Sequence, residues 1–179
     1  MNQEYRLYTF VNFYLSSIQQ GIQSAHVTHS LFVKYTHSEI GTVTYNSEDI
    51  LWDWAKNDKT MIVLNGGAGP DIKSAFETIS SLNITHNGAV LPIECFYEDA
   101  SLDGMMTSFG IVVPPCYYDA IPSAKAVWDA PFGGTWKGPE GAFVYDQKDF
   151  PTGQARVIYM PGTSEHLFIS IMKSCGLAR

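Results

Sequence analysis

Hydrophobic and polar positions along the first part of the chain change from strand-like to helix-like spacing. Residues 5–15 (YRLYTFVNFYL) alternate aromatic and β-branched side chains, which is typical of a strand. Apolar positions then recur at the spacing of one helical face, which predicts a helix that is capped by Ser16 or Ser17 and runs to about Tyr35. The positions predicted to face the core are Ile18, Ile22, Ala25, His29 and Phe32.

The following segments continue this alternation. Residues 47–57 fit a short helix, with Ser47 as its cap and with Leu51 and Trp54 facing inward. Residues 60–65 (TMIVLN) are a continuous apolar run, typical of a strand covered on both faces. A glycine-rich turn, a further helix and two strands complete the pattern, the helix over residues 70–83 and the strands over 89–99 and 106–114.

This order of elements predicts an α/β sandwich with a mixed β-sheet. Residues 115–160 differ from it, because they are rich in Gly, Pro and aromatic residues and show little periodicity. Residues 161–179 fit an amphipathic helix capped by Ser164. We therefore expect a single domain over 1–179, with a core over 1–114, an insertion over 115–160 and a final helix over 161–179.

Charge and composition narrow the classes of partner. The net charge is −7, and residues 1–116 hold five basic against twelve acidic residues. Proteins that bind long nucleic acids normally present clustered Lys and Arg, so we expect no long nucleic acid as a partner. No run reaches the roughly 18 apolar residues of a membrane span, and the N-terminus lacks the basic and apolar regions of a secretory signal.

The cysteines also indicate a protein that is not secreted. Cys95, Cys116 and Cys175 are an odd number without C-x-x-C spacing, which argues against a disulfide framework or a zinc site and suits a reducing cytosol. The composition thus predicts a cytoplasmic protein with no membrane partner. We assign no metal-ligating residue and no cofactor, and the sequence leaves open whether a metal participates.

Two motifs resemble those of the type II peptidyl-tRNA hydrolases of archaea and eukaryotes. GIQSAH (21–26) opens the first predicted helix, and Gln23 and His26 fit the Gln-x-x-His of that family. LPIECFYEDA (91–100) is similar to the family's Leu-Pro-led strand, with Asp99 at the start of the motif Asp-Ala-Gly-Arg-Thr-Gln. The resemblance covers most of the predicted core and implies the fold of that family, with a catalytic aspartate at Asp99.

The sequence departs from the family at the residues associated with hydrolysis of the ester between peptide and tRNA. The family's lysines, four and six residues before its Gln, fall on Gln19 and Ser17, and its Arg-Thr pair falls on Leu102 and Asp103. Of its lysine, aspartate and threonine, only Asp99 remains. Because a fold does not transmit a function, we interpret the resemblance as a shared scaffold with a different ligand.

His26 and His29 are the first candidate residues, since positions three apart on a helix can approach one point and imidazole titrates near neutrality. His29 continues the predicted apolar face, so we interpret it as a hydrogen-bonded core residue. His26 lies just outside that face, and a catalytic and a structural role are equally compatible with its position. Without a nearby third ligand the two histidines do not predict a metal site.

Two turns carry further candidates. Glu98, Asp99 and Asp103 form a carboxylate cluster that suits a general base or a cation, or else a solvated turn; only Asp99, which the resemblance supports, is assigned to a site. LNGGAGPD (64–71) is compatible with a phosphate cradle, with Lys73 beside it, but it matches no nucleotide-binding fingerprint. A plain loop is the preferred interpretation of this turn.

The insertion suggests the class of ligand. Its aromatic residues and Lys137 suit a planar base that carries a phosphate, or else a hairpin or an oligomer interface that buries the aromatic side chains. We therefore expect a small nucleotide-type ligand, such as a cyclic nucleotide or an ADP-ribose-like signal, with His26 and Asp99 as acid and base. The predicted ligand-binding residues are Gln19, Gln23, Asp103, Trp128, Trp136 and Lys137.

Such a protein would degrade or sequester a signal, as phage proteins do against host defence, in which case it acts in the host cytoplasm. Two alternatives stay open at this point: a peptidyl-tRNA hydrolase, and a non-catalytic protein–protein module that forms a homo-oligomer.

Overall fold

The computed structural model describes residues 4–36, 46–98, 104–119, 142–144, 157–159 and 163–178. The chain divides into two compact units. The first comprises Met1–Pro114 and Cys175–Arg179, and the second comprises Pro115–Ser174.

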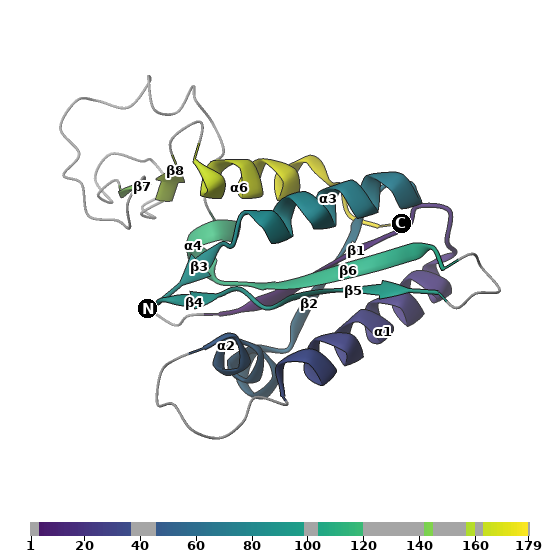
Figure 1. The fold of residues 1–179 in the computed structure, drawn as a ribbon, viewed down its shortest axis with the longest axis horizontal. Helices are drawn as coiled ribbons and strands as arrows, with labels where there is room; N and C mark the ends of the chain where they lie inside the picture. Colours follow the sequence, from purple (N-terminus) through teal and green to yellow (C-terminus); the bar gives the residue numbers. More distant parts are fainter. Residues whose placement is uncertain are drawn as a thin grey trace. The chain divides into compact units, whose positions relative to one another are not determined.

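The first unit contains a four-stranded mixed sheet in the order β2-β1-β6-β5 (Figure 1). β1 pairs in parallel with β2 and antiparallel with β6, and β6 pairs antiparallel with β5. The mixed α/β class predicted from the sequence is confirmed. The strands are β1 (Arg6–Val11), β2 (Thr60–Asn65), β5 (Ile93–Tyr97) and β6 (Met106–Val113), and a separate ladder joins β3 (Thr85–His86) to β4 (Ala89–Val90).

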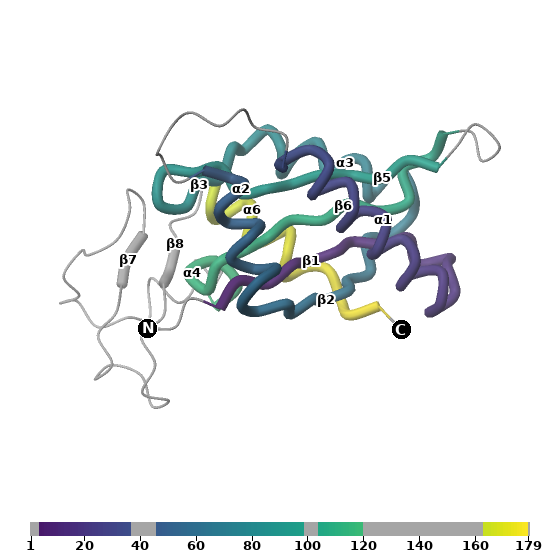
Figure 2. Tube along the Cα trace, turned by 90° about the horizontal axis from the view of Figure 1, so that it is seen from below, coloured from purple at the N-terminus to yellow at the C-terminus, as the bar shows by residue number. Residues whose placement is uncertain are grey.

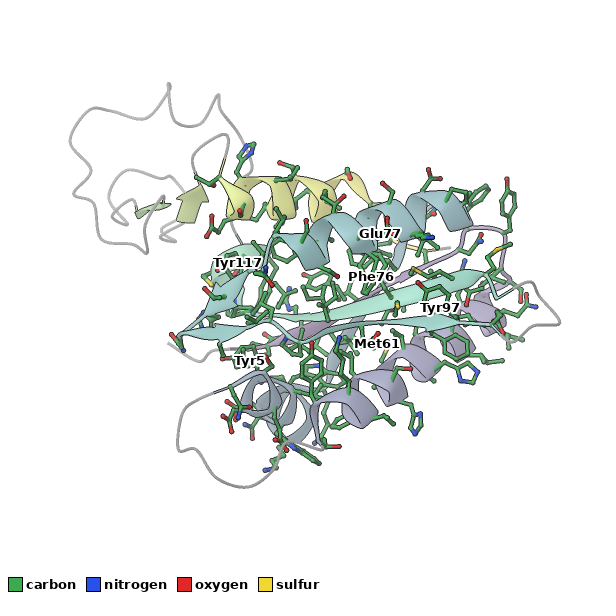
Figure 3. All side chains as sticks on the ribbon, viewed as in Figure 1. Tyr5, Met61, Phe76, Glu77, Tyr97 and Tyr117 are labelled. Carbon is green, nitrogen blue, oxygen red and sulfur yellow. The ribbon has the colours of Figure 1, made fainter. Side chains whose placement is uncertain are left out.

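Helices cover both faces of this sheet (Figure 1). α1 and α2 lie on one face and α3 on the other, where the Phe76 ring of α3 points towards the sheet and lies 5.8 Å from the Phe109 ring of β6 (Figure 3). Phe109 also stacks on Phe10 of β1 at 4.3 Å, so aromatic packing joins α3 to the two central strands. The helices are α1 (Ser17–Tyr35), α2 (Ser47–Asp53), the π-helical turn η1 (Trp54–Asp58) and α3 (Gly69–Ser81).

The caps explain where these helices begin. Ser16 caps α1 as predicted, because its hydroxyl accepts a hydrogen bond from the Gln19 N–H while the Gln19 side chain accepts from the Ser16 N–H. α2 differs from the prediction: the Asn46 side chain accepts from the Glu48 and Asp49 N–H groups, so Asn46 rather than Ser47 is its cap. An asparagine one position earlier satisfies the same free N–H groups.

The apolar face predicted for α1 is wrong. Ile18 and Ile22 are 78% and 48% exposed, and Ala25 and His29 are exposed as well. The helix has the predicted period but is rotated about its axis, so that the face against the sheet comprises Gln20, Gln23, Ser24, Val27 and Leu31. Polar residues occupy the first half of this face because the sheet supplies hydrogen-bond partners for them.

The strand over residues 60–65 has the predicted bounds but not the predicted burial. β2 is an edge strand with Met61 37% exposed, whereas all eight positions of the central strand β6 are buried. The C-terminal segment pairs with the outer edge of β2, through an antiparallel bridge between Leu64 and Leu177 (Figure 2). β2 thus lies at the margin of the sheet with only this short segment beyond it, so an apolar run does not suffice to predict burial.

The described residues of the second unit form two helices and a strand pair. The Tyr117 ring of α4 packs edge-to-face on Phe168 of α6 at 5.6 Å, and Lys173 donates a hydrogen bond to the Tyr118 carbonyl oxygen. A helix lies within the range predicted for the final helix but covers only Ser164–Ser174 of residues 161–179. The Thr163 hydroxyl rather than Ser164 accepts from a first-turn N–H group, that of His166. The elements are α4 (Pro115–Tyr118), β7 (Ala142–Val144), β8 (Val157–Tyr159) and α6 (Ser164–Ser174). Across the described ranges, no helix has the length and apolar character needed to span a membrane.

Candidate functional site

The first half of α1 is joined to the sheet by buried hydrogen bonds. The Ser24 hydroxyl donates to the Gln20 carbonyl oxygen at 2.9 Å, and it lies 2.9 Å from the Thr9 hydroxyl of β1. Because the single Ser24 proton is used by Gln20, the Thr9 hydroxyl is the donor between the two. Ser108 of β6 donates to the Gln23 carbonyl oxygen at 3.2 Å. These bonds fix the position of the helix over β1 and β6.

Gln23, Glu98 and Thr107 form the centre of the candidate site. The Gln23 side-chain N–H donates to Glu98 Oε1 at 2.6 Å, and the Thr107 hydroxyl donates to Gln23 Oε1 at 2.8 Å. Thr107 Oγ1 also lies 3.4 Å from Glu98 Oε1. The buried Gln23 amide therefore connects Thr107 of β6 to Glu98, which directly follows β5, and orients the Glu98 carboxylate.

This arrangement leaves one carboxylate oxygen available. Both contacts to the Glu98 side chain are made through Oε1, and Glu98 forms no ion pair with any residue that the structure describes. The residue is partly exposed. A carboxylate held through one oxygen presents the other as a pre-oriented acceptor or base.

His26 lies one helical turn after Gln23 and is exposed. Its ring stacks on the Phe96 ring of β5, with the centroids 4.5 Å apart and the planes 10° from parallel. Phe96 and Glu98 are two residues apart and both contact α1, so they extend from the same face of β5. The available oxygen of Glu98 and the stacked pair are therefore neighbours along one surface, which we call the α1–β5 site: Gln23, His26, Phe96, Glu98 and Thr107.

An ion pair fixes the far end of the same contact. Lys34 of α1 lies 2.7 Å from a carboxylate oxygen of Glu94, two residues before Phe96, and donates to the Ile93 carbonyl oxygen. Burial lowers the pKa of Lys34, but its hydrogen bond to Glu94 and the nearby charges outweigh this effect, and the pKa is raised. Lys34 is thus charged and engaged with Glu94.

The opposite face of β5 has different chemistry. Cys95 lies between Glu94 and Phe96, and burial, followed by the Glu94 charge, raises the pKa of its thiol to about 11. Tyr97 lies beside α3, near Glu77 (Figure 3), and burial with the adjacent Cys95 raises its pKa. Both groups are therefore protonated at neutral pH.

The predicted site residues have different outcomes. Gln23 and His26 lie in one surface, whereas Gln19 is engaged in the cap of α1, where its side-chain oxygen accepts from Ser16. His29 is exposed, so its interpretation as a core residue is wrong. The remaining predicted residues lie outside the described ranges, and they are Asp99, Asp103, Trp128, Trp136 and Lys137.

Sequence reasoning missed two contributors to the site. In the sequence, Glu98 is one of three carboxylates in a turn, of which only Asp99 is predicted to belong to a site, and Thr107 falls within a predicted strand that is mostly apolar. A usable signal was present: Glu94, Phe96 and Glu98 alternate along the strand, which places them on one face. The adjacent Thr107 and Ser108 also interrupt an otherwise apolar run.

The glycine-rich turn after β2 is not a phosphate cradle in this fold. The Gly66 N–H donates to the Val11 carbonyl oxygen, the Gly67 N–H to Asn65 Oδ1, and the Ala68 N–H to Asp71 Oδ2. These donors are used internally, and Asp71 adds negative charge at the start of α3. The plain-loop interpretation agrees with these contacts.

No known protein family or curated protein matches this sequence. Within the ranges that the structure describes, no group of three or more His, Cys, Asp or Glu side chains is arranged to hold a metal ion. The contacts that the structure shows within the α1–β5 site are hydrogen bonds and a ring stack.

Proposed function

We propose that the α1–β5 site binds a small nucleotide-type ligand. The observation that carries this proposal is the Glu98 carboxylate, which is fixed through Oε1 by Gln23 and Thr107 and leaves Oε2 available next to the exposed His26–Phe96 stack. A nucleoside presents the two complementary features, a flat base and sugar hydroxyl donors.

Each part of the site has a role in this proposal. The base stacks on the exposed His26 ring, which Phe96 supports from behind, and stacking of this kind contributes about 1–3 kcal/mol per base. A ribose hydroxyl donates to Glu98 Oε2. Gln23 does not contact the ligand but holds the carboxylate in position, since its amide already bonds to Glu98 and Thr107.

The charge of the site favours recognition of the nucleoside end. Lys34 is paired with Glu94, and no described lysine or arginine pairs with Glu98. A phosphate group would meet repulsion beside this carboxylate, so we place it away from Glu98. The ligand-binding role predicted for Lys137 lies outside the described residues and stays a prediction.

Binding is better supported than hydrolysis. Among the described residues of the site, no cation is positioned to stabilise the negative charge that develops during ester or phosphodiester hydrolysis. Hydrolysis with Asp99 and His26 as base and acid is the second candidate, which the proximity of His26 to a carboxylate favours. The missing family lysines and this acidic surface both weigh against peptidyl-tRNA as the substrate.

The proposal is tested with the full chain and a panel of cyclic di- and trinucleotides, ADP-ribose derivatives and peptidyl-tRNA. After incubation the protein is removed by filtration, and both the filtrate and the material released by heating are chromatographed. We expect an intact nucleotide that is released only on heating. A new product in the filtrate would establish the hydrolytic candidate instead.

Two variants locate the binding. Glu98→Gln keeps the shape of the side chain but removes the charge of the acceptor, and we expect affinity to fall at least about tenfold, the usual scale for a hydrogen bond to a charged group. Glu77→Gln, the same change on α3, is the matched control and should bind like the wild type. Equal affinity of the two variants, or retention of no compound in the panel, would overturn the proposal.

A further inference from the structure

A pocket of about 810 Å³ opens at the carboxyl ends of β1 and β2. Because these strands are parallel neighbours, their carboxyl ends meet at one edge of the sheet, the usual position of ligands in open α/β sheets. The pocket lies within the first unit, and its volume is in the range of small-molecule sites. Its lining residues are Phe13, Gln20, Asn65, Gly176, Leu177 and Ala178. None of them belongs to the α1–β5 site.

Gln20 offers this pocket a hydrogen-bond acceptor. Its Nε2 donates to the Leu15 carbonyl oxygen at 3.1 Å. Since a carbonyl oxygen only accepts, this bond fixes the orientation of the amide and leaves Oε1 available. Gln20 is only 6% exposed, and no described residue donates to Oε1. The residue as a whole is buried, but Oε1 is not among the buried polar atoms that lack a partner, so it is an acceptor that a ligand in the pocket can reach.

Asn65 offers the complementary donor. Its Oδ1 accepts from the Gly67 N–H at 3.0 Å. Since a backbone N–H only donates, Nδ2 is the atom that remains available, and no described residue accepts from it. The two amides, oriented by different backbone partners, therefore present one acceptor and one donor among the residues that line the pocket.

The other walls are apolar or made of backbone. The Phe13 ring is partly exposed and is supported by Tyr14, whose ring centroid lies 3.7 Å away. The C-terminal segment is held against β2 by hydrogen bonds from Asn65 N–H to the Gly176 carbonyl oxygen and from Ala178 N–H to the Val63 carbonyl oxygen. None of the lining side chains carries a charge.

We propose that this pocket binds a neutral, flat heteroaromatic compound that carries an N–H donor and a carbonyl or ring-nitrogen acceptor, the class of nucleobases and aromatic carboxamides. The ring packs on Phe13, its donor reaches Gln20 Oε1 and its acceptor receives a hydrogen bond from Asn65 Nδ2. A charged ligand is disfavoured because none of the described residues that line the pocket offers a counter-charge for the desolvated group. This site is separate from the proposed nucleotide site and does not depend on it.

The test compares nicotinamide with nicotinate, which share a ring and differ in having a carboxamide or a carboxylate, together with adenine. Affinities for the full chain are measured by ligand-observed NMR. Nicotinamide and adenine should bind, and nicotinate should bind at least about tenfold more weakly, the scale of an uncompensated polar group. Equal binding of nicotinamide and nicotinate, or no binding of either neutral probe, would overturn the proposal without the use of any variant.

Asn65→Asp tests the assigned donor. The variant retains Oδ1 for the Gly67 N–H but replaces Nδ2 by an oxygen, so nicotinamide affinity should fall about tenfold or more. Asn87→Asp, the same change in the β3–β4 turn, is the control and should bind normally. Glu98→Gln should also leave nicotinamide binding unchanged, which separates a failure here from a failure of the nucleotide site. Equal affinity of the Asn65 and Asn87 variants contradicts the assignment.

Discussion

The two halves of the buried face of α1 differ in chemistry although they pack on the same sheet. The first half carries Gln20, Gln23 and Ser24, and each makes a side-chain hydrogen bond across the contact or to the chain nearby. The second half carries Val27 and Leu31, which are fully buried and apolar. A single helix thus combines a polar contact beside the candidate site with an ordinary hydrophobic contact at its other end.

The strand beneath shows the same division. Thr107 and Ser108 of β6 bond to Gln23, whereas Gly110, further along the strand, allows close packing. A Cβ atom at Gly110 would lie 3.2 Å from Val27 Cγ1 and 3.6 Å from Leu31 Cδ1. The apolar half therefore stabilises the fold. The polar half, whose groups are costly to bury unless each has a partner, contains the residues of the proposed ligand site.

The largest effect on stability is expected in the apolar half. Leu31→Ala removes a fully buried side chain and leaves a cavity against β6, so the free energy of unfolding should fall by about 2–5 kcal/mol. Ligand affinity should be unchanged while the variant remains folded. Urea denaturation measures the free energy of unfolding, and a ligand titration at urea concentrations below the unfolding transition measures the affinity. A loss below about 0.5 kcal/mol would contradict the packing of this half.

The two faces of β5 extend the comparison to reactivity. A thiol with a pKa of about 11 has roughly a hundredfold less thiolate than one at its usual value of about 9, so Cys95 should be alkylated slowly at pH 8. Because the thiolate fraction rises tenfold per pH unit below the pKa, the rate should keep rising up to about pH 11. Mass spectrometry of iodoacetamide-treated protein, by site and pH, gives this profile. A plateau near pH 9 would contradict it.

A substitution in the polar half of α1 should reduce stability less than Leu31→Ala does, but it should reduce ligand binding more. Gln23→Leu leaves Glu98 and Thr107 without their common partner and should lower the free energy of unfolding by about 1–3 kcal/mol. The carboxylate loses its fixed orientation, so nucleotide affinity should fall even where the protein is fully folded. If binding survives this change, Gln23 does not position Glu98.

The smallest effect is expected on the outer face of α1. Ile22→Ser replaces an exposed apolar residue, which should change the free energy of unfolding by no more than about 0.5 kcal/mol. The same change would be strongly destabilising if the apolar face predicted from the sequence were the buried one. Urea denaturation of this variant beside Leu31→Ala therefore compares the two orientations of the helix directly.

The positions of the elements were largely predictable, whereas the orientation of α1 was not. Ser16 and its capping box begin α1 where the sequence indicated, and β2 has the expected bounds. The period of the helix was correct, but hydrophobicity selected the face of Ile18 and Ile22. Burial of Gln23 depends on Thr107, 84 residues away in the sequence, and such a partner is not visible in local spacing.

The α1–β5 site was also predictable only in part, because it too depends on contacts between residues far apart in the sequence. The Gln-x-x-His spacing indicated the turn of the helix that carries Gln23 and His26 in the candidate site, because side chains three apart share a surface. The carboxylate could not be selected from the turn by composition, since three candidates lay within six residues of one another. Glu98 is distinguished by its hydrogen bonds to Gln23 and Thr107, which depend on the pairing of β5 with β6.

The central claim is that the polar half of α1 and the adjoining strand β5 form the ligand site, and backbone NMR during titration with the retained nucleotide tests it most directly. Shift changes should concentrate at Gln23, His26, Phe96 and Glu98, with the Val27–Tyr35 half of α1 and all of α3 unchanged beyond small effects. Shifts confined to other elements, with these four residues unaffected, would contradict the account.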